Sequence, residues 1–152
     1  MSIDDPRYKI RTLLSASITD ANLTRDDDAT ELTWISFYAP YTIPLPKIFL
    51  EKNVDLIFTV ADAEHVETTL GVSHVAEHVV TIYAIDKYSG GTKIITASLV
   101  LWKATKELRS VFKENPWGSL RSFVEDHIET EDVGTTIIWG KPCRIQYKTY
   151  SA

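Results

Sequence analysis

Apolar residues along the chain change their spacing several times, and each change predicts a different element. Behind Asp5-Pro6, apolar residues recur every three or four positions, which is typical of an amphipathic helix. An N-cap residue followed by proline is also a common helix start. We therefore expect a helix over residues 6–19. The polar stretch 20–30 that follows is expected to be a loop.

Three strand-like stretches come next. Residues 31–38 are rich in β-branched and aromatic side chains, and residues 47–50 and 54–61 have a similar character. Prolines between residues 40 and 46 predict an extended connection after the first stretch, because proline fixes its own φ and disfavours helix in the residue before it. The second and third stretches can also be read as one strand interrupted at Lys52-Asn53.

The clearest strand of the sequence covers Val75–Asp86, where both alternating faces are mostly apolar. A strand that is apolar on both faces is expected near the centre of its sheet. The residues before it, 62–75, are polar and include Gly71. Their pattern leaves a long loop and a short helix open.

After Ser89-Gly90-Gly91 the spacing becomes helical again. We expect a helix of 24 residues from Thr92 to Asn115, ended by Pro116. At 1.5 Å per residue this helix would be about 36 Å long. It is the longest element that the pattern predicts.

The last third of the chain returns to strand character. A strand is expected at residues 120–129, and a turn at 132–134 leads into a return strand that starts at 135–139. Gly140 and Pro142 indicate a bulge or an edge position. Beyond them, polar and apolar residues alternate, which predicts a last strand with one solvent-exposed and one buried face.

These expectations give the element order α-β-β-β-α-β-β in a single domain over residues 1–152. Runs of strands interrupted by two helices favour the α+β class. We expect a mostly antiparallel β-sheet with one long and one shorter helix packed on one of its faces.

The first half of the expected long helix has one apolar stripe more than its own core needs. A continuous seam that we assign to the sheet consists of Ile94, Ala97, Leu101, Ala104, Leu108 and Val111/Phe112. A second stripe of Ile95, Leu99 and Trp102 lies about 140° away at 100° per residue. The first helix or a loop of the same chain can cover this stripe, a neighbouring subunit can cover it, or each can cover part of it. Ile95, Leu99 and Trp102 are therefore the candidate subunit interface.

Composition narrows the class of protein. Hydrophobic residues make up 44% and charged residues 24%, as in soluble globular proteins. The formal net charge of −5 argues against tight binding of duplex DNA, which needs a basic patch. No apolar run approaches the length of a membrane span. The N-terminal residues lack the features of a signal peptide, so we expect the protein to stay in the cell that makes it.

The sequence contains no arrangement that predicts catalysis. Neither a nucleophile elbow nor a carboxylate pair suited to acid–base chemistry is present, so we expect no enzyme and no catalytic or cofactor-binding residue. His74 and His78 are four residues apart, which on a strand is about 13 Å and too far for one zinc ion. No metal site is expected. Cys143 is expected to be a small buried hydrophobe.

The order of the elements resembles that of the tail terminator (tail completion) proteins of long-tailed phages and related archaeal viruses. The likeness is carried by the helix Arg7–Ile18, the proline-led strand Pro46–Leu50, the strand Val79–Asp86, the turn at Gly90-Gly91 and the helix Thr92–Asn115. It covers nearly the whole chain, but only as a pattern. No counterpart is assigned to residues 62–75.

The resemblance implies a structural virion protein that is made in the host cytoplasm. It implies a hexameric ring that joins the tail tube to the head-side connector, with DNA passing through the lumen without tight binding. The stripe of Ile95, Leu99 and Trp102 would then contact the adjacent subunit. The alternatives are a cytoplasmic α+β ligand-binding or regulatory module, and a small enzyme of unrecognised type.

Overall fold

The computed structural model describes residues 11–12, 14–15, 23–38, 44–61, 64–69, 73–113, 119–134 and 136–150. The strands of its main sheet are β1 (Trp34–Tyr38), β2 (Leu56–Val60), β3 (Glu64–Thr69), β4 (Ser73–Ile85), β7 (Ser119–Glu125), β8 (Glu129–Val133) and β9 (Thr136–Tyr150). They form a seven-stranded sheet of order β1-β2-β4-β9-β7, in which β3 also pairs with β4 and β8 also pairs with β9. Among the described strands of this sheet, only β1 and β2 pair in parallel, and the other pairs are antiparallel. The expected α+β class with a mostly antiparallel sheet is confirmed.

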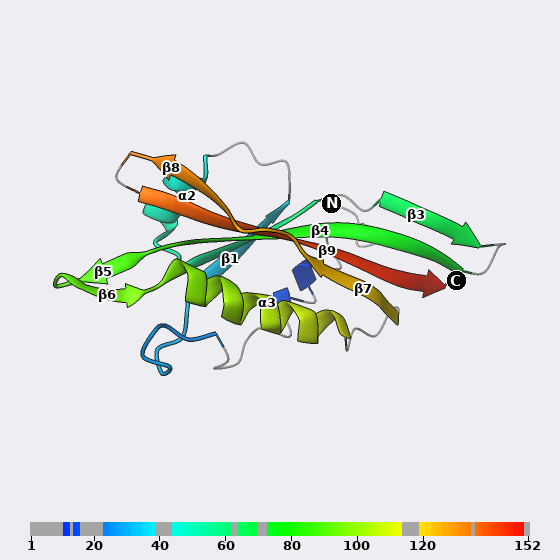
Figure 1. Ribbon diagram of the computed structural model, residues 1–152, viewed down its shortest axis with the longest axis horizontal. Coiled ribbons are helices and arrows are strands. Elements are labelled where there is room, and N and C mark those ends of the chain that lie inside the picture. The colour runs from blue at the N-terminus through cyan, green and yellow to red at the C-terminus, as the bar shows by residue number, and fades with distance from the viewer. Residues whose placement is uncertain are drawn as a thin grey trace.

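The centre of the sheet is a long antiparallel pair, β4 and β9. All 13 residues of β4 have a partner on β9, from Ser73 opposite Tyr150 to Ile85 opposite Ile138. β2 pairs with the other edge of β4, so the prediction of a central strand is confirmed. The 15 residues of β9 extend over about 50 Å at 3.3 Å per residue. Both strands therefore run beyond the helix that covers them (Figure 1).

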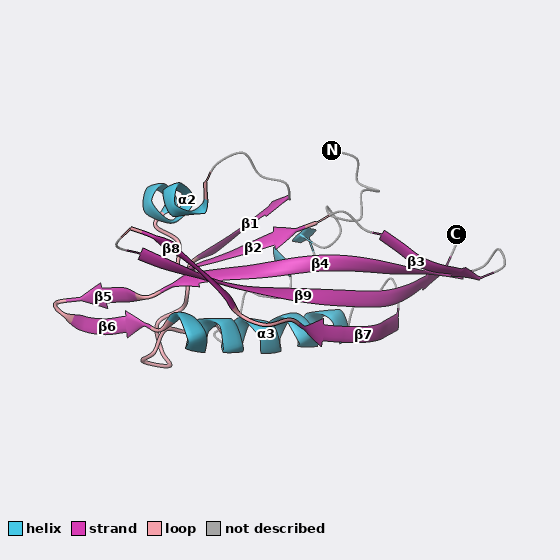
Figure 2. Cartoon of the chain, turned by 45° about the horizontal axis from the view of Figure 1, so that its top comes forward, coloured by secondary structure: helices cyan, strands magenta, loops and turns pink. Residues whose placement is uncertain are grey.

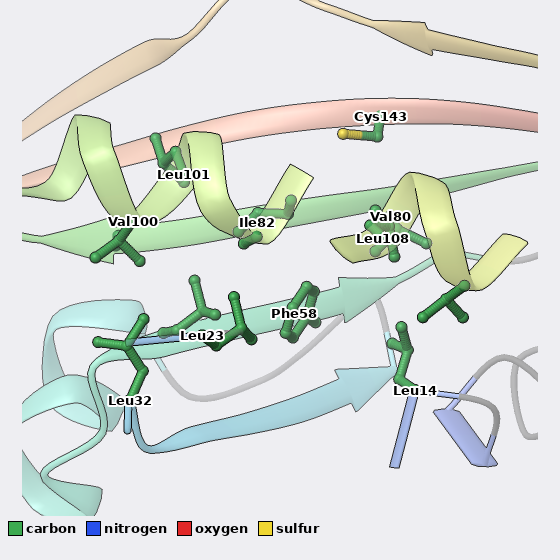
Figure 3. Close-up of a cluster of buried hydrophobic side chains, with 14 of the residues drawn as sticks. Leu14, Leu23, Leu32, Phe58, Val80, Ile82, Val100, Leu101, Leu108 and Cys143 are labelled. Carbon is green, nitrogen blue, oxygen red and sulfur yellow. The ribbon is translucent and has the colours of Figure 1, made fainter. Parts of the chain in front are cut away.

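Helix α3 (Ala97–Lys113) covers one face of this sheet, and helix α2 (Leu45–Lys52) lies on the other face (Figure 2). The seam predicted for the sheet is confirmed within α3, because its members there are all buried: Ala97, Leu101, Ala104, Leu108, Val111 and Phe112. They pack against the buried side chains of β2, β4 and β9, among them Phe58, Ile82 and Cys143 (Figure 3).

The first predicted helix is described only in part. Residues 11–12 and 14–15 are helical, and Leu14 is fully buried in the same core as α3. This segment therefore packs on the face where we expected both helices. The remaining residues of the expected helix 6–19 lie outside the described part of the chain.

Residues 47–50, which we expected to be a strand, belong to helix α2. The buried side chains Leu45, Ile48 and Phe49 follow helical spacing and form a second core with Ile57 of β2 and Ile138 of β9. A short apolar run does not distinguish strand from helix by periodicity. The prolines next to it start the helix, since proline is favoured in a first helical turn. Asn53 ends α2 in the left-handed conformation, with φ 49°.

The predicted start of the long helix at Thr92 is also wrong. Strands β5 (Lys87–Ser89) and β6 (Thr92–Ile95) form a hairpin, and α3 begins only at Ala97. Gly90 and Gly91 have φ values of 58° and 81°, the positive pair that a two-residue hairpin turn requires. The helix is thus 17 residues long, about 25 Å. β-branched residues after the turn favour the strand, although their apolar positions also fit a helical pattern.

The segment whose pattern left a loop and a helix open contains a strand instead. β3 pairs with the first half of β4, with a register irregularity between His65 and Glu67. It adds to the same edge of β4 that β2 occupies farther along. The first half of β4, which β2 does not reach, is therefore paired with β3 on that edge.

The strand predicted at 120–129 is divided. β7 ends at Glu125, β8 starts at Glu129, and both pair with β9. Pro142 lies opposite this interruption, where its carbonyl accepts the N–H of Asp126 at 2.9 Å. A proline is tolerated there because its missing N–H faces the gap in the ladder. Pro142 is therefore inside the sheet, between β4 and an interrupted neighbour, and not at an edge of the sheet.

Gly140 has a packing role of its own. It lies directly opposite Tyr83 on β4, and a Cβ atom built on it would be 2.9 Å from Cε1 of the Tyr83 ring. The tyrosine ring thus occupies the space above the glycine. A larger residue at position 140 would displace that ring.

Candidate subunit interface

The structure separates the three residues of the predicted interface. Ile95 is in β6, before the helix, and it is 0% exposed in the core of its own chain. Its side-chain direction is set by the strand, so its inclusion in an exposed helical stripe was wrong. Leu99 is half-buried, whereas Trp102 is 55% exposed on α3. The surface left for a partner is therefore shorter than the predicted stripe and centred on Trp102.

The start of α3 is held by two aspartates from other parts of the chain. Thr96 is the N-cap residue, since its carbonyl accepts the N–H of Val100 at 3.0 Å. Asp26 binds the backbone N–H and the hydroxyl of Thr96, and Asp86 Oδ1 accepts the N–H of Ala97 at 2.8 Å. Both negative charges are at the positive end of the helix dipole, where they stabilise it.

A loop of the same chain covers one flank of α3. This capping loop, residues 23–31, is closed by a bridge between Thr24 and Glu31. Lys103 of α3 donates to the carbonyls of Thr24 and Arg25, at 3.1 and 3.2 Å, and pairs with Asp28 Oδ1 at 2.8 Å. Own-chain coverage thus exists, but it ends on the Lys103 side of the helix and leaves Trp102 exposed.

The capping loop is also ordered from within. Asp27 Oδ1 accepts the N–H groups of Ala29 and Thr30, each at 2.9 Å, and its Oδ2 accepts the Thr30 hydroxyl at 2.6 Å. These bonds to Thr30, its hydroxyl first, lower the pKa of Asp27 to about 2. All three aspartates of the run 26–28 therefore bind groups of this chain.

The side of α3 that faces away from the sheet is basic and carries one large aromatic ring. Lys106 Nζ lies 4.4 Å from the centroid of the Trp102 ring, a cation–π contact one turn along the helix. Ser98, Arg109, Ser110 and Lys113 are exposed on the same side. We call Leu99, Trp102, Lys106 and Lys113 the outer face of α3.

Arg109 connects α3 to β7 and is occupied within the chain. Its guanidinium lies 4.8 Å from the centroid of the Phe123 ring and bonds Glu125 Oε2 at 2.6 Å. Lys141 bonds the other oxygen of Glu125, also at 2.6 Å. The bond from Lys141 and then that from Arg109 lower the pKa of Glu125, so this carboxylate stays charged. Neither cation is left for a partner.

A buried ionic cluster fixes the base of the β5–β6 hairpin. The Asp55 side chain is 1% exposed and lies 2.8 Å from Lys87 Nζ and 3.4 Å from Arg25 Nη2. It also accepts the N–H of Thr33 at 3.1 Å, and Lys87 donates to the carbonyl of Val54 at 2.9 Å. The cluster ties together the capping loop, β5 and the residues just before β1 and β2. Its role is structural, because every one of these bonds stays within the chain.

A cavity of about 220 Å³ lies on the α2 face of the sheet. Its lining residues are Leu45, Thr81, Tyr83, Glu129, Thr130, Glu131, Ile138, Gly140 and Pro142. Ligand pockets are commonly about 300–1,000 Å³, so this cavity is small for an organic ligand. Among the described residues, no three His, Cys, Asp or Glu side chains are placed to hold a metal ion.

Two reactive residue types are buried in the α3 core. Cys143 is fully buried, as expected, and burial raises the pKa of its thiol to about 12. His78 is fully buried on the core face of β4. His74 and His78 lie on the same strand, which starts two residues before the predicted Val75. The thiol is closed to solvent and stays protonated at neutral pH, so it is not a nucleophile.

No protein-family model matches the chain, and a search of curated proteins found no similar sequence. The described helices include none that is long and apolar enough to cross a membrane. The likeness to tail terminator proteins therefore depends on the order of elements expected from the sequence, and two elements that carried it are corrected by the structure: residues 47–50 are helical, and the long helix starts at Ala97. The surface that the fold leaves exposed on α3 is independent of that likeness.

Proposed function

We propose that this protein is a non-enzymatic structural protein of a virion, a tail terminator that forms a homo-oligomeric ring. The ring, hexameric by the resemblance, would join the tail tube to the head-side connector. DNA would pass through its lumen without tight binding. The protein would be made in the host cytoplasm and reside in the virion.

The outer face of α3 is the observation that carries this proposal. The opposite side of the helix already fills the core, and the capping loop is bound on the Lys103 side, yet Trp102 is 55% exposed. Tryptophan is enriched among the residues that dominate binding energy at interfaces. An exposed tryptophan next to half-buried Leu99 therefore suits contact with another protein surface.

The shape of the molecule supports assembly as well. β4 and β9 extend beyond α3, and the β5–β6 hairpin projects from the other end (Figure 1). Such extensions add surface away from the core that neighbouring subunits can use. The net charge of −5 suits a conduit along which DNA slides without sticking.

The cavity beside α2 favours the alternative, a cytoplasmic α+β ligand-binding or regulatory module. Its volume of about 220 Å³ is below the common range for ligand pockets. The ring is therefore the better supported reading. The alternative predicts a monomer or dimer whose thermal stability rises with a small metabolite.

The test is the oligomeric state of the purified chain, by light scattering and negative-stain imaging. We expect a ring-sized species in the wild type, and a folded monomer for Trp102→Glu or Leu99→Glu. Leu50→Glu is the matched control, because Leu50 is 83% exposed on α2, on the other face. It should assemble normally. A wild type that remains monomeric at high concentration, alone and with purified tail tubes, would contradict the ring.

A further inference from the structure

We infer that the outer face of α3 binds the acidic strand β8 of a second copy of this chain, in a head-to-tail contact. The inference rests on the proposed self-assembly and deepens it, because it names the two surfaces that meet. It follows from a separation of charge within one subunit and from where the two surfaces lie.

The helix supplies the basic surface. Of the 17 residues of α3, four are Lys or Arg and one is acidic, Glu107. Lys103 and Arg109 pair with Asp28 and Glu125 of the same chain. Lys106 and Lys113 form no ion pair with any carboxylate in the described residues, and both are exposed. Two cations beside an exposed tryptophan are thus available to a partner.

The strand supplies the acidic surface. Residues 125–132 contain five carboxylates, of which Glu125 and Asp126 pair with cations of their own sheet. Glu129, Glu131 and Asp132 are exposed and form no ion pair with a described cation. Ile128, just before β8, and Ile137, opposite Asp132 on β9, are exposed apolar residues. Glu129 and Glu131 point to one face of β8, and Asp132 and Ile137 point to the other. The outer edge of β8, with acidic groups on both faces, therefore complements a basic surface that includes Trp102.

The two charged stretches have similar lengths. Lys106 and Lys113 are separated by about 10 Å along the axis of α3, at 1.5 Å per residue. Glu129 and Asp132 are separated by about 10 Å along β8, at 3.3 Å per residue, and they point to opposite faces of the strand, so that they flank its outer edge. In the described part of the sheet β8 pairs only with β9, so its other edge is open to a neighbour.

Their positions make the contact head-to-tail. In both overall views β8 lies on one side of the central strands and α3 on the other (Figures 1 and 2). One molecule cannot bring its own two surfaces together, and two basic α3 faces repel each other across a symmetric dimer. A contact between different surfaces repeats from subunit to subunit and closes into a ring when the rotation allows it.

Charge reversal tests the pairing. Lys106→Glu/Lys113→Glu places acidic groups against an acidic β8, and Glu129→Lys/Glu131→Lys places basic groups against a basic α3. Each double variant alone should associate about tenfold or more weakly than the wild type, measured by analytical ultracentrifugation. An equimolar mixture of the two should assemble again, because every α3–β8 contact between unlike variants is attractive. The mixed ring would contain an even number of subunits in alternation.

Lys47→Glu/Lys52→Glu on α2 is the matched control, since both lysines are exposed on the other face. It should assemble like the wild type. If the wild type assembles and the reversed variants assemble equally well, the inferred pairing is wrong while the ring stands. The charges of β8 would then only protect an edge strand from pairing. If the wild type does not assemble at all, alone or on tail tubes, both proposals fail.

Discussion

The carboxylate of Asp26 binds Thr96 through both of its oxygens, although 70 residues separate the two in sequence. Oδ1 accepts the backbone N–H at 2.9 Å, and Oδ2 accepts the hydroxyl at 2.6 Å. Thr96 is the N-cap of α3, so the capping loop determines where the helix begins. The helix that carries the proposed interface is thereby fixed to the N-terminal part of the chain.

Replacing Asp26 should weaken that attachment. We expect Asp26→Ala to lower the free energy of unfolding by about 1–2 kcal/mol, because the helix start loses a cap and the Thr96 hydroxyl loses its partner. Urea denaturation followed by circular dichroism measures this. Glu51→Ala is the control, since among the described residues Glu51 makes only an exposed pair with Lys47, at 3.8 Å. It should change stability by no more than about 0.5 kcal/mol. Equal losses in the free energy of unfolding for the two variants would show that the bonds between Asp26 and Thr96 do not stabilise the fold.

The buried cluster around Asp55 should be costly to break. Asp55→Asn removes the charge that faces Lys87 at 2.8 Å and Arg25 at 3.4 Å, and we expect a loss of about 3 kcal/mol. The partners are partly exposed, so water relieves some of the cost. Adding Lys87→Met to Asp55→Asn should recover part of the loss, because it removes the cation left without a partner. Additive losses in this double-mutant cycle, measured by urea denaturation, would show that the two groups are not coupled.

Cys143 should react only when the protein unfolds. Burial raises the pKa of its thiol from 9.0 to about 12, so the folded state favours the protonated form. The corresponding stabilisation is fully present below about pH 9 and is lost as the pH rises from 9 toward 12. At pH 8 we expect alkylation by iodoacetamide to follow the rate or extent of global unfolding and to accelerate in urea. Rapid labelling of the native protein would contradict the buried position.

The alternation of residues along the chain was sufficient for the central strand and for the core side of α3. Val80 and Ile82 point into the core as the pattern predicted, and so do Leu101 and Leu108. In these elements local periodicity and burial agree, because the strand is covered on both edges by other strands and the helix has one apolar side against the sheet. The α+β class followed from the same signal.

The same signal failed where two periods fit one short run. Ile48-Phe49-Leu50 is an apolar triplet that fits a strand, but the α2 core needs only Ile48 and Phe49, and Leu50 is 83% exposed. Ile94 fits the helical seam and Ile95 the second stripe, but after the turn at Gly90-Gly91 both residues belong to strand β6 of a hairpin. In both places the decision came from contacts with distant residues, such as Ile138 for α2 and Asp26 for the start of α3.

By itself, the sequence determined the class of the fold, the central strand, the core seam of α3 and the burial of Cys143, because each depends on a local pattern of apolar residues. Tertiary structure alone decided which part of the second stripe faces outward. Ile95 points inward because the helix starts after it. Asp26, 70 positions from Thr96, and Asp86, 11 positions from Ala97, cap that start. Trp102 stayed outside because Lys103, and not the tryptophan, holds the capping loop. Bonds between residues so far apart leave no trace in local spacing, so only the folded chain reveals the surface centred on Trp102.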